Sequence, residues 1–188
     1  MMILNRQKVF ISYSTHDTPY AKAICTWLEE NSIPCWMAPR DIIPGTSYGE
    51  AIIRAIRQAK IMVLVFTAYA NESKYVNKEV ERAVSNGTII IPVRFQNVSL
   101  CQALDFFLSA EQWLDALNPP LKKHLDKLVE SVKVLQVSSQ LQHAPKKESY
   151  KEARKDIRMF EELAPDNWYG QSRYSLFRWI RNQFKDNS

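Results

Sequence analysis

Residues 61–95 read IMVLVFTAYANESKYVNKEVERAVSNGTIIIPVRF, and this stretch decides the fold. It opens with one apolar run, residues 61–68, and closes with another, residues 88–95. Continuous apolar runs are typical of parallel strands that are covered on both faces. Between them, residues 73–87 have the spacing of an amphipathic helix, and Gly87 supplies the left-handed residue that often ends one. The stretch therefore predicts a strand, a helix and a second, parallel strand.

Strand and helix patterns continue on both sides of this stretch. Further strands are predicted at residues 8–14, at 33–37 and, as a weak edge strand, at 111–117. Further helices are predicted at residues 18–31, 47–59, 100–108 and 121–135. Strands that alternate with helices over short connections form a parallel sheet with helices on both faces. We therefore expect a doubly wound α/β domain with about five strands, whose ligand site lies beyond the carboxyl ends of the strands.

Two of these helices carry start signals. Ser47 and Glu50 match a capping box, in which each side chain bonds the backbone of the other residue. Asp17 or Thr18 is expected to cap the earlier helix, because Pro19 follows in what would be its first turn.

The chain divides by composition into three parts. Residues 1–136 carry the α/β pattern, residues 137–150 have the composition of a linker, and residues 151–188 predict a C-terminal helical extension rich in aromatic side chains. The net charge of +5 lies entirely beyond residue 120. Because these basic residues are interleaved with acidic ones, they indicate a solvated helix surface and not a nucleic-acid site.

Composition and motifs exclude several classes of protein. Hydrophobic residues make up 46% and charged residues 24%, as in soluble globular proteins. The N-terminal residues form neither a signal sequence nor a spanning helix, so a cytoplasmic protein without membrane contact is expected. The sequence holds no glycine-rich phosphate loop of the known patterns. Three cysteines without a C-x-x-C spacing, together with three scattered histidines, indicate reduced core thiols and no metal site.

One carboxylate is a candidate for chemistry. Glu79 follows Tyr75 by four residues, so both lie on one face of the predicted helix. The expected buried stripe of that helix is Val76, Val80, Ala83 and Val84, and Glu79 lies at its border. From spacing alone, Glu79 can face a cleft, or it can face water in salt bridges with Lys78 or Arg82.

Five blocks of the sequence, taken in order, resemble the Toll/interleukin-1 receptor (TIR) domain of the stand-alone bacterial type. They are FISYSTHD, CWMAPRDIIPGTSYGEAI, VLVFTAYANESKYVNKEVERA, IIPVRF and QWLDA. The resemblance covers residues 7–135. It implies a flavodoxin-like fold of three layers with a five-stranded parallel sheet.

For many members, the resemblance also implies cleavage of NAD between nicotinamide and ribose, giving ADP-ribose or a cyclic ADP-ribose isomer. NAD is then the substrate, and no cofactor or metal is implied. Nicotinamide leaves as a neutral base, so one carboxylate that stabilises a cationic sugar is sufficient. Similarity to the TIR component of Thoeris-like antiphage systems implies that the product is a signal, read by a downstream nucleotide-sensing effector.

The resemblance assigns roles to individual residues. The family motif W-x-x-x-E falls on residues 75–79, so Glu79 takes the catalytic role and Tyr75 stands where Trp is usual. Tyr13 and Ser14 match positions that line the nucleotide pocket.

Trp36, Arg40 and Ser47 complete the expected substrate-binding set. The loop Ala38 to Thr46 corresponds to a family loop that joins TIR subunits and closes over substrate. Two alternatives remain: a non-enzymatic scaffold that acts by homotypic TIR–TIR interaction, and a nucleoside-processing transferase of related fold.

Overall fold

The computed structural model describes residues 8–141 of the 188-residue chain, with side chains through residue 138. Its centre is a five-stranded sheet in the order β2-β1-β3-β4-β5, with every neighbouring pair parallel. This is the flavodoxin-like order, and the predicted α/β class is confirmed. The strands are β1 (Val9–Ser12), β2 (Cys35–Trp36), β3 (Ile61–Phe66), β4 (Ile89–Arg94) and β5 (Leu114–Asp115).

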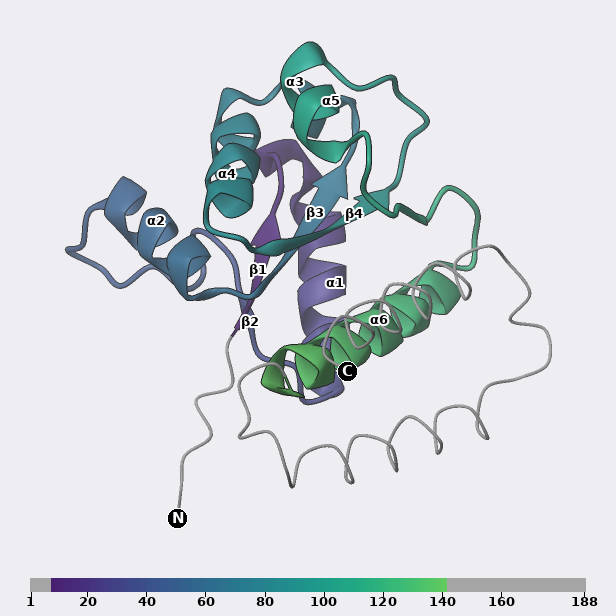
Figure 1. Cartoon of the computed structure of the whole chain (residues 1–188), viewed down its shortest axis with the longest axis horizontal. Coiled ribbons are helices and arrows are strands. Elements are labelled where there is room, and N and C mark those ends of the chain that lie inside the picture. Colours follow the sequence, from purple (N-terminus) through teal and green to yellow (C-terminus); the bar gives the residue numbers. More distant parts are fainter. Residues whose placement is uncertain (1–7, 142–188) are drawn as a thin grey trace, which may run out of the picture. The chain divides into compact units, whose positions relative to one another are not determined.

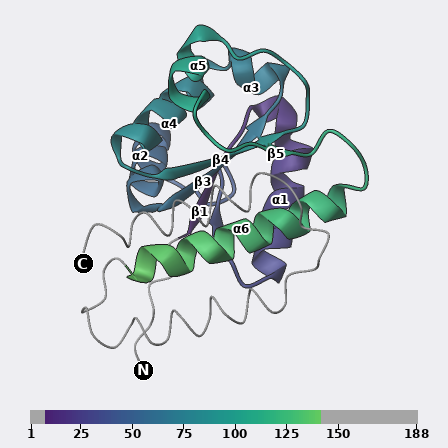
Figure 2. The ribbon, with the colours of Figure 1, turned by 45° about the vertical axis from the view of Figure 1, so that its right-hand side comes forward.

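Helices connect the strands and cover both faces of the sheet. Figures 1 and 2 show α1 and α6 on one side of the strands and α2, α4 and α5 on the other. The α-helices are α1 (Thr18–Glu30), α2 (Tyr48–Gln58), α3 (Ala68–Glu72), α4 (Lys74–Ser85), α5 (Gln102–Leu108) and α6 (Leu121–Leu141), and a 3-10 turn, η1 (Thr15–Asp17), precedes α1.

The central strand β3 is buried along its whole length. Because side chains alternate along a strand, Ile61, Val63 and Val65 face one core. That core also holds the buried faces of α1 and α6. The other three residues, Met62, Leu64 and Phe66, face a second core with α2, α4 and α5. The continuous apolar run in the sequence therefore serves two separate cores.

Polar side chains join the loops at the carboxyl edge of the sheet. The hydroxyl of Thr67 donates a hydrogen bond of 2.7 Å to the buried carboxyl of Asp17 and accepts one from the backbone of Ala70. The side chain of Asn71 bonds the backbone of Ser99 and of Cys101. These contacts fasten α3 to the loops that follow β1 and β4.

Several local predictions differ from the structure. The short helix α3 lies between β3 and α4, where no helix was predicted. Val84 is 41% exposed, so the buried stripe of α4 consists of Val76, Val80 and Ala83. Ser47 precedes α2 but makes no side-chain cap bond, so the expected capping box is absent. The carboxyl of Asp17 does not cap α1, because it is occupied by Thr67.

The C-terminal predictions fall largely outside the described residues. The helix α6 continues to Leu141, so the first residues of the expected linker are helical. The rest of the linker and the extension 151–188 lie beyond the described part of the chain. Within that part, no helix is long and apolar enough to cross a membrane.

The burial of α4 predicts unequal effects for two valines of the same helix. Val80→Ala should lower the free energy of unfolding by about 2 kcal/mol, because it removes buried methyl groups and leaves a cavity. Val84→Ala should change it by less than about 0.5 kcal/mol, since this side chain is largely exposed. Urea unfolding monitored by circular dichroism measures both changes, and equal losses would contradict the observed orientation of α4.

Candidate active site

The site begins with the orientation of α4. Ser73 caps this helix by accepting a hydrogen bond from the backbone of Val76. Burial of Val76 and Val80 against the sheet fixes the rotation of the helix about its axis. Glu79 therefore lies at the edge of the buried stripe and its carboxyl group reaches toward β1.

Ser12, the last residue of β1, receives this carboxyl group. Its side chain is completely buried, and its hydroxyl donates a 2.6 Å hydrogen bond to Oε2 of Glu79. Glu79 keeps some exposed surface, but protein surrounds its carboxyl group. Burial raises the pKa of Glu79 to about 7, although the bond from Ser12 favours the charged form and lowers it.

Glu79 has no cationic partner within the described residues. The ion pairs found there join Arg40 to Glu29 and Asp41, and Arg94 to Asp115. The salt bridges with Lys78 or Arg82 that the sequence left open are thus not formed. A buried carboxylate without a counter-charge costs stability, and such groups cluster at functional sites.

The charge of this carboxylate acts on nearby tyrosine side chains. Burial, and then the charge of Glu79 and the neighbouring Tyr75, raise the pKa of Tyr48. Burial, Tyr48 and Glu79 likewise raise the pKa of Tyr13. Tyr48 is 53% exposed and Tyr75 is 75% exposed, so both rings border solvent. The charge of Glu79 thus acts on the phenol groups of Tyr13 and Tyr48, whose pKa values it raises.

The structure brings together two of the predicted binding residues, Tyr13 and Tyr75, with Glu79. Sequence reasoning missed Ser12 and Tyr48. Tyr48 is the first residue of α2, directly after Ser47, so its place at the sheet edge was a signal that could have been used. Ser12 gave no signal, because a serine inside a strand has no fixed partner in the sequence.

The other predicted binding residues have contacts of their own. Ser14 is buried, with its hydroxyl 3.4 Å from Nδ1 of His16. Trp36 stacks on Phe10 at a ring separation of 5.2 Å.

Ser47 is exposed, and Arg40 donates its described hydrogen bonds to Glu29, Asp41 and the Cys35 carbonyl. Substrate contacts for these four residues, Ser14, Trp36, Arg40 and Ser47, stay predictions.

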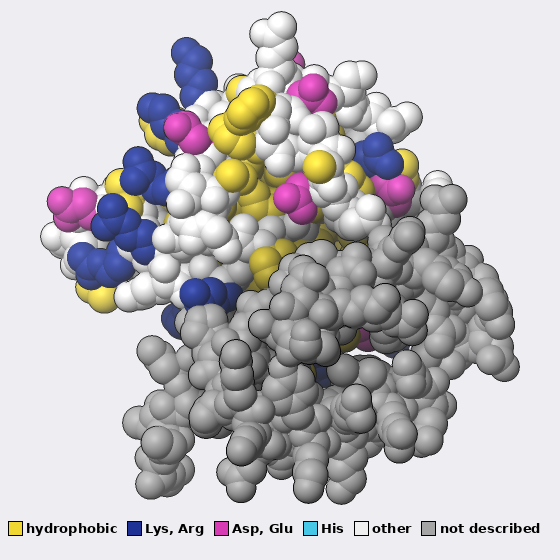
Figure 3. All heavy atoms as spheres, in the orientation of Figure 1, with side chains coloured by type: hydrophobic (Ala, Val, Ile, Leu, Met, Phe, Trp, Pro, Cys, Tyr) yellow, Lys and Arg dark blue, Asp and Glu magenta, His cyan; other side chains and the backbone are white. Residues whose placement is uncertain are grey.

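Basic side chains gather near the Glu79 site. Figure 3 shows Lys and Arg side chains along the edge formed by α2 and α4. The exposed basic residues of these two helices are Arg54, Arg57, Lys74, Lys78 and Arg82. A positive surface of this kind attracts anionic groups such as phosphates.

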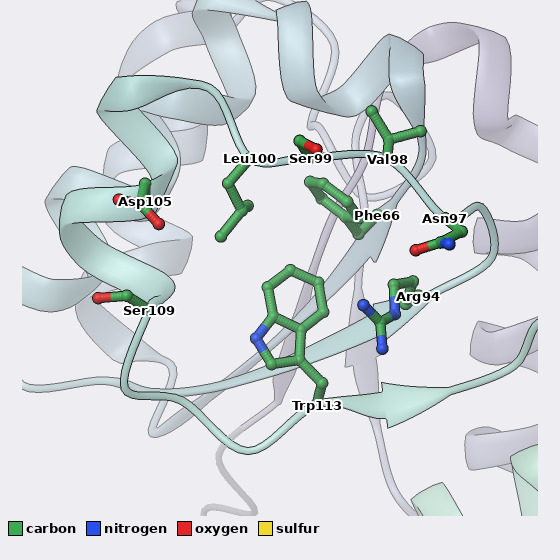
Figure 4. Close-up of a pocket in the computed structure, with 9 residues that line it drawn as sticks. All are labelled: Phe66, Arg94, Asn97, Val98, Ser99, Leu100, Asp105, Ser109 and Trp113. Carbon is green, nitrogen blue, oxygen red and sulfur yellow. The ribbon is translucent and has the colours of Figure 1, made fainter.

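A separate pocket of about 440 Å³ opens beyond the ends of β3 and β4 and does not include Glu79. Figure 4 shows Trp113 below Phe66 and Leu100, with Arg94 at one side and Asp105 and Ser109 at the other. The Arg94 guanidinium lies 5.6 Å from the centre of the Trp113 ring and pairs with Asp115. This pocket holds none of the residues that the sequence predicted for binding.

Comparisons with known proteins agree with this fold. The family model described as TIR domain matches residues 9–129. Among curated proteins, the stimulator of interferon genes protein of Magallana gigas is 28% identical over 119 residues, which are 60% of this chain and 25% of that protein. The chain thus spans about a quarter of the length of that relative.

Solved structures give the same fold. The TIR domain of the Toll-related receptor TRR-2 from Hydra magnipapillata has a TM-score of 0.58 at 20% identity, covering 66% of this chain and 97% of that one. The TIR domains of the activated Roq1 resistosome, which recognises the pathogen effector XopQ, give 0.55 at 16%, covering 67% and 99%. A TIR-STING receptor from C. gigas in complex with 2',3'-cGAMP gives 0.56 at 22%, covering 69% and 41%.

The environment of Glu79 predicts a stability that falls as pH rises. Its pKa is about 7 in the folded protein and ordinarily 4.5, so the unfolded chain ionises first. Between pH 4.5 and 8 the wild-type protein should lose up to about 3 kcal/mol through this group. Glu79→Gln removes that loss and should stabilise the protein at pH 8 more than at pH 4.5.

Unfolding free energies at the two pH values measure this effect. Glu81→Gln is the matched control, because Glu81 is exposed on the same helix. If both variants show the same pH dependence relative to wild type, the surroundings of Glu79 do not oppose its ionisation.

Proposed function

Because this chain belongs to the TIR domain family, we propose that it cleaves the bond between nicotinamide and ribose in NAD, with Glu79 as the catalytic carboxylate. The observation that carries the proposal is the enclosed, unpaired carboxyl group of Glu79, held by Ser12 at the carboxyl edge of the sheet. A structural glutamate would ordinarily have a cationic partner or full hydration. Glu79 has neither within the described residues, and its charge acts on the phenol groups of Tyr13 and Tyr48.

The chemistry requires little more than this arrangement. The nicotinamide of NAD carries a positive charge, and it leaves with the electron pair of the glycosidic bond as a neutral base. Positive charge then develops on C1 of the ribose, as in glycoside hydrolysis. The ionised carboxylate of Glu79 stabilises that charge, and no cationic side chain competes for it. The tyrosine rings supply flat surfaces on which nicotinamide or ribose can pack.

An acceptor completes the reaction. Water attacks C1 and gives ADP-ribose, nicotinamide and one proton. A carboxylate with a pKa near 7 is suited to accept that proton at neutral pH, because general bases work best near the ambient pH. Attack by a nucleophile of the same ADP-ribosyl group, in place of water, gives a cyclic isomer. The exposed basic residues of α2 and α4 would attract the diphosphate group of NAD, from which both products form.

The proposal extends to signalling. The product would serve as a nucleotide signal in defence against phage, read by a separate nucleotide-sensing effector. The TIR-STING receptor from C. gigas, solved in complex with 2',3'-cGAMP, supports such a pairing of a TIR domain with nucleotide recognition.

A second candidate is a scaffold without turnover. Ile43, in the loop from Ala38 to Thr46, is 66% exposed. Tyr48 and Tyr75, outside this loop, are 53% and 75% exposed. Exposed apolar and aromatic side chains of this kind favour contact with another subunit. The two candidates are compatible, since subunit contact through these side chains does not exclude NAD cleavage at Glu79.

Product analysis tests the catalytic role. Concentrated wild-type protein incubated with NAD should release nicotinamide, measured by chromatography with mass spectrometry. Glu79→Gln should lower the rate by about 100-fold or more, the usual cost of removing a group that stabilises transition-state charge. Glu81→Gln should retain the rate. If neither wild type nor Glu81→Gln releases nicotinamide at concentrations where the protein self-associates, the scaffold is favoured.

The bond from Ser12 predicts a shift in the pH profile. Activity should rise with pH through about 7, because the reaction uses the ionised form of Glu79. Ser12→Ala removes a hydrogen bond that favours this form, so the midpoint should move to higher pH. Nicotinamide release measured from pH 5 to 9 gives both midpoints. A lower rate with an unchanged midpoint would mean that Ser12 acts only on structure.

A further inference from the structure

Two buried cysteines and a glutamate lie together on the face of the sheet opposite Glu79. Cys25 and Glu29 are four residues apart on α1 and so share one face of that helix. Cys35 lies on the neighbouring strand β2. The two sulfur atoms and a carboxylate oxygen of Glu29 all lie within 4.8 Å of one another. Both cysteines are free thiols.

We propose that Cys25, Cys35 and Glu29 bind a zinc ion. Two thiolates and one carboxylate match the donors that Zn²⁺ takes in proteins, and three protein ligands with a water in the fourth position is an established arrangement for this metal. Mg²⁺ and Ca²⁺ prefer sites made of oxygen alone, so the sulfur pair disfavours them. The sequence gave no such signal, because the two cysteines are ten positions apart and the fold alone brings them together.

A positive side chain lies beside the three ligands. A zinc ion with two thiolates and one carboxylate has a net charge of −1. Arg40 offsets part of this negative charge, because its guanidinium donates to both carboxylate oxygens of Glu29, at 2.8 and 3.1 Å, while it also pairs with Asp41. It also donates to the backbone carbonyl of Cys35 at 3.2 Å. A carboxylate has enough lone pairs to bind a metal and keep these bonds, so Arg40 would orient Glu29 as an outer partner.

The surroundings allow a metal to enter and to be retained. The cysteines belong to an apolar core with Leu28, Ile33 and Met37, which keeps water from the sulfur side. The Glu29 side chain is 40% exposed, so the carboxylate side is open to solvent. A bound ion would join α1 to β2 and, through Arg40, to the start of the loop Ala38 to Thr46. The loop would then be held more firmly when zinc is present.

Cobalt provides the spectroscopic probe for the test. Reduced, full-length protein titrated with Co²⁺ should develop a thiolate-to-cobalt charge-transfer band in the near ultraviolet and visible bands of tetrahedral cobalt. Added Zn²⁺ should remove both, because zinc binds such ligands more tightly than cobalt. Zinc should also raise the thermal unfolding temperature of the wild-type protein.

Variants identify the ligands. Cys25→Ser and Cys35→Ser should each weaken zinc binding by at least about 100-fold, and Arg40→Ala by about 10- to 100-fold as the loss of an outer partner. The control is Cys101→Ser, which removes the remaining cysteine and should leave the band and the affinity unchanged. Circular dichroism confirms that each variant folds.

Cadmium bound to the wild-type protein gives a second measurement of the ligand atoms. The chemical shift of bound ¹¹³Cd distinguishes two sulfur ligands from a site made of oxygen and nitrogen. A shift that shows two sulfurs, with the cobalt band lost in the Cys35→Ser variant, supports the site. Absence of the charge-transfer band, a shift without sulfur, or a band that depends on Cys101 overturns it. None of these measurements requires NAD cleavage, so the outcome is independent of the proposed function.

Discussion

The rest of the structure depends on one constraint: the central strand β3 has no face in contact with solvent. Its alternate residues must be covered on both sides, and helices that precede β3 in the chain as well as helices that follow it provide this cover. The short connections then turn at the carboxyl edge of the sheet, where the loops after β1, β2 and β3 meet. The polar bonds of Asp17 with Thr67 and of Asn71 with Ser99 hold these loops in place. The site is a consequence of this convergence.

Two buried carboxyl groups lie at that edge, and their surroundings differ. Asp17 is bonded to the hydroxyl of Thr67 in the structural connection between η1 and α3, and burial raises its pKa. Glu79 is bonded to Ser12, and its charge raises the pKa values of the neighbouring Tyr13 and Tyr48. Each carboxyl group accepts a hydrogen bond from a hydroxyl, and neither has an ion-pair partner within the described residues. The neighbouring phenol groups therefore distinguish Glu79, since desolvation is common to both.

The loop from Ala38 to Thr46 is anchored at its start. The Tyr13 hydroxyl donates to the carbonyl of Ala38, the first residue of the loop, and Tyr13 packs against the core that α1 shares. A second anchor lies at Arg40, which bonds Glu29 of α1, and at Asp41, which accepts from the backbone of Met37. The tip of the loop around Ile43 is exposed. Both anchors therefore hold the start of the loop on the side of the sheet that carries α1.

The sequence by itself determined the class of fold, because apolar runs and helix periods depend on local chain geometry and burial alone. It also determined Glu79 as the carboxylate to consider, through its spacing from Tyr75 and the family motif. The predicted helix caps were wrong where a side chain had a choice of partners. Asp17 accepts from Thr67 and does not cap its own helix, and the Ser47 side chain makes no cap bond.

Only the tertiary structure decided that Glu79 is enclosed, since that depends on Ser12 and Tyr48, which come from two elements distant in sequence. It likewise brought Cys25 and Cys35 together across a helix and a strand. The physical reason is the same in each case: a pattern along the chain fixes which face a residue occupies, while the partner on that face is set by packing.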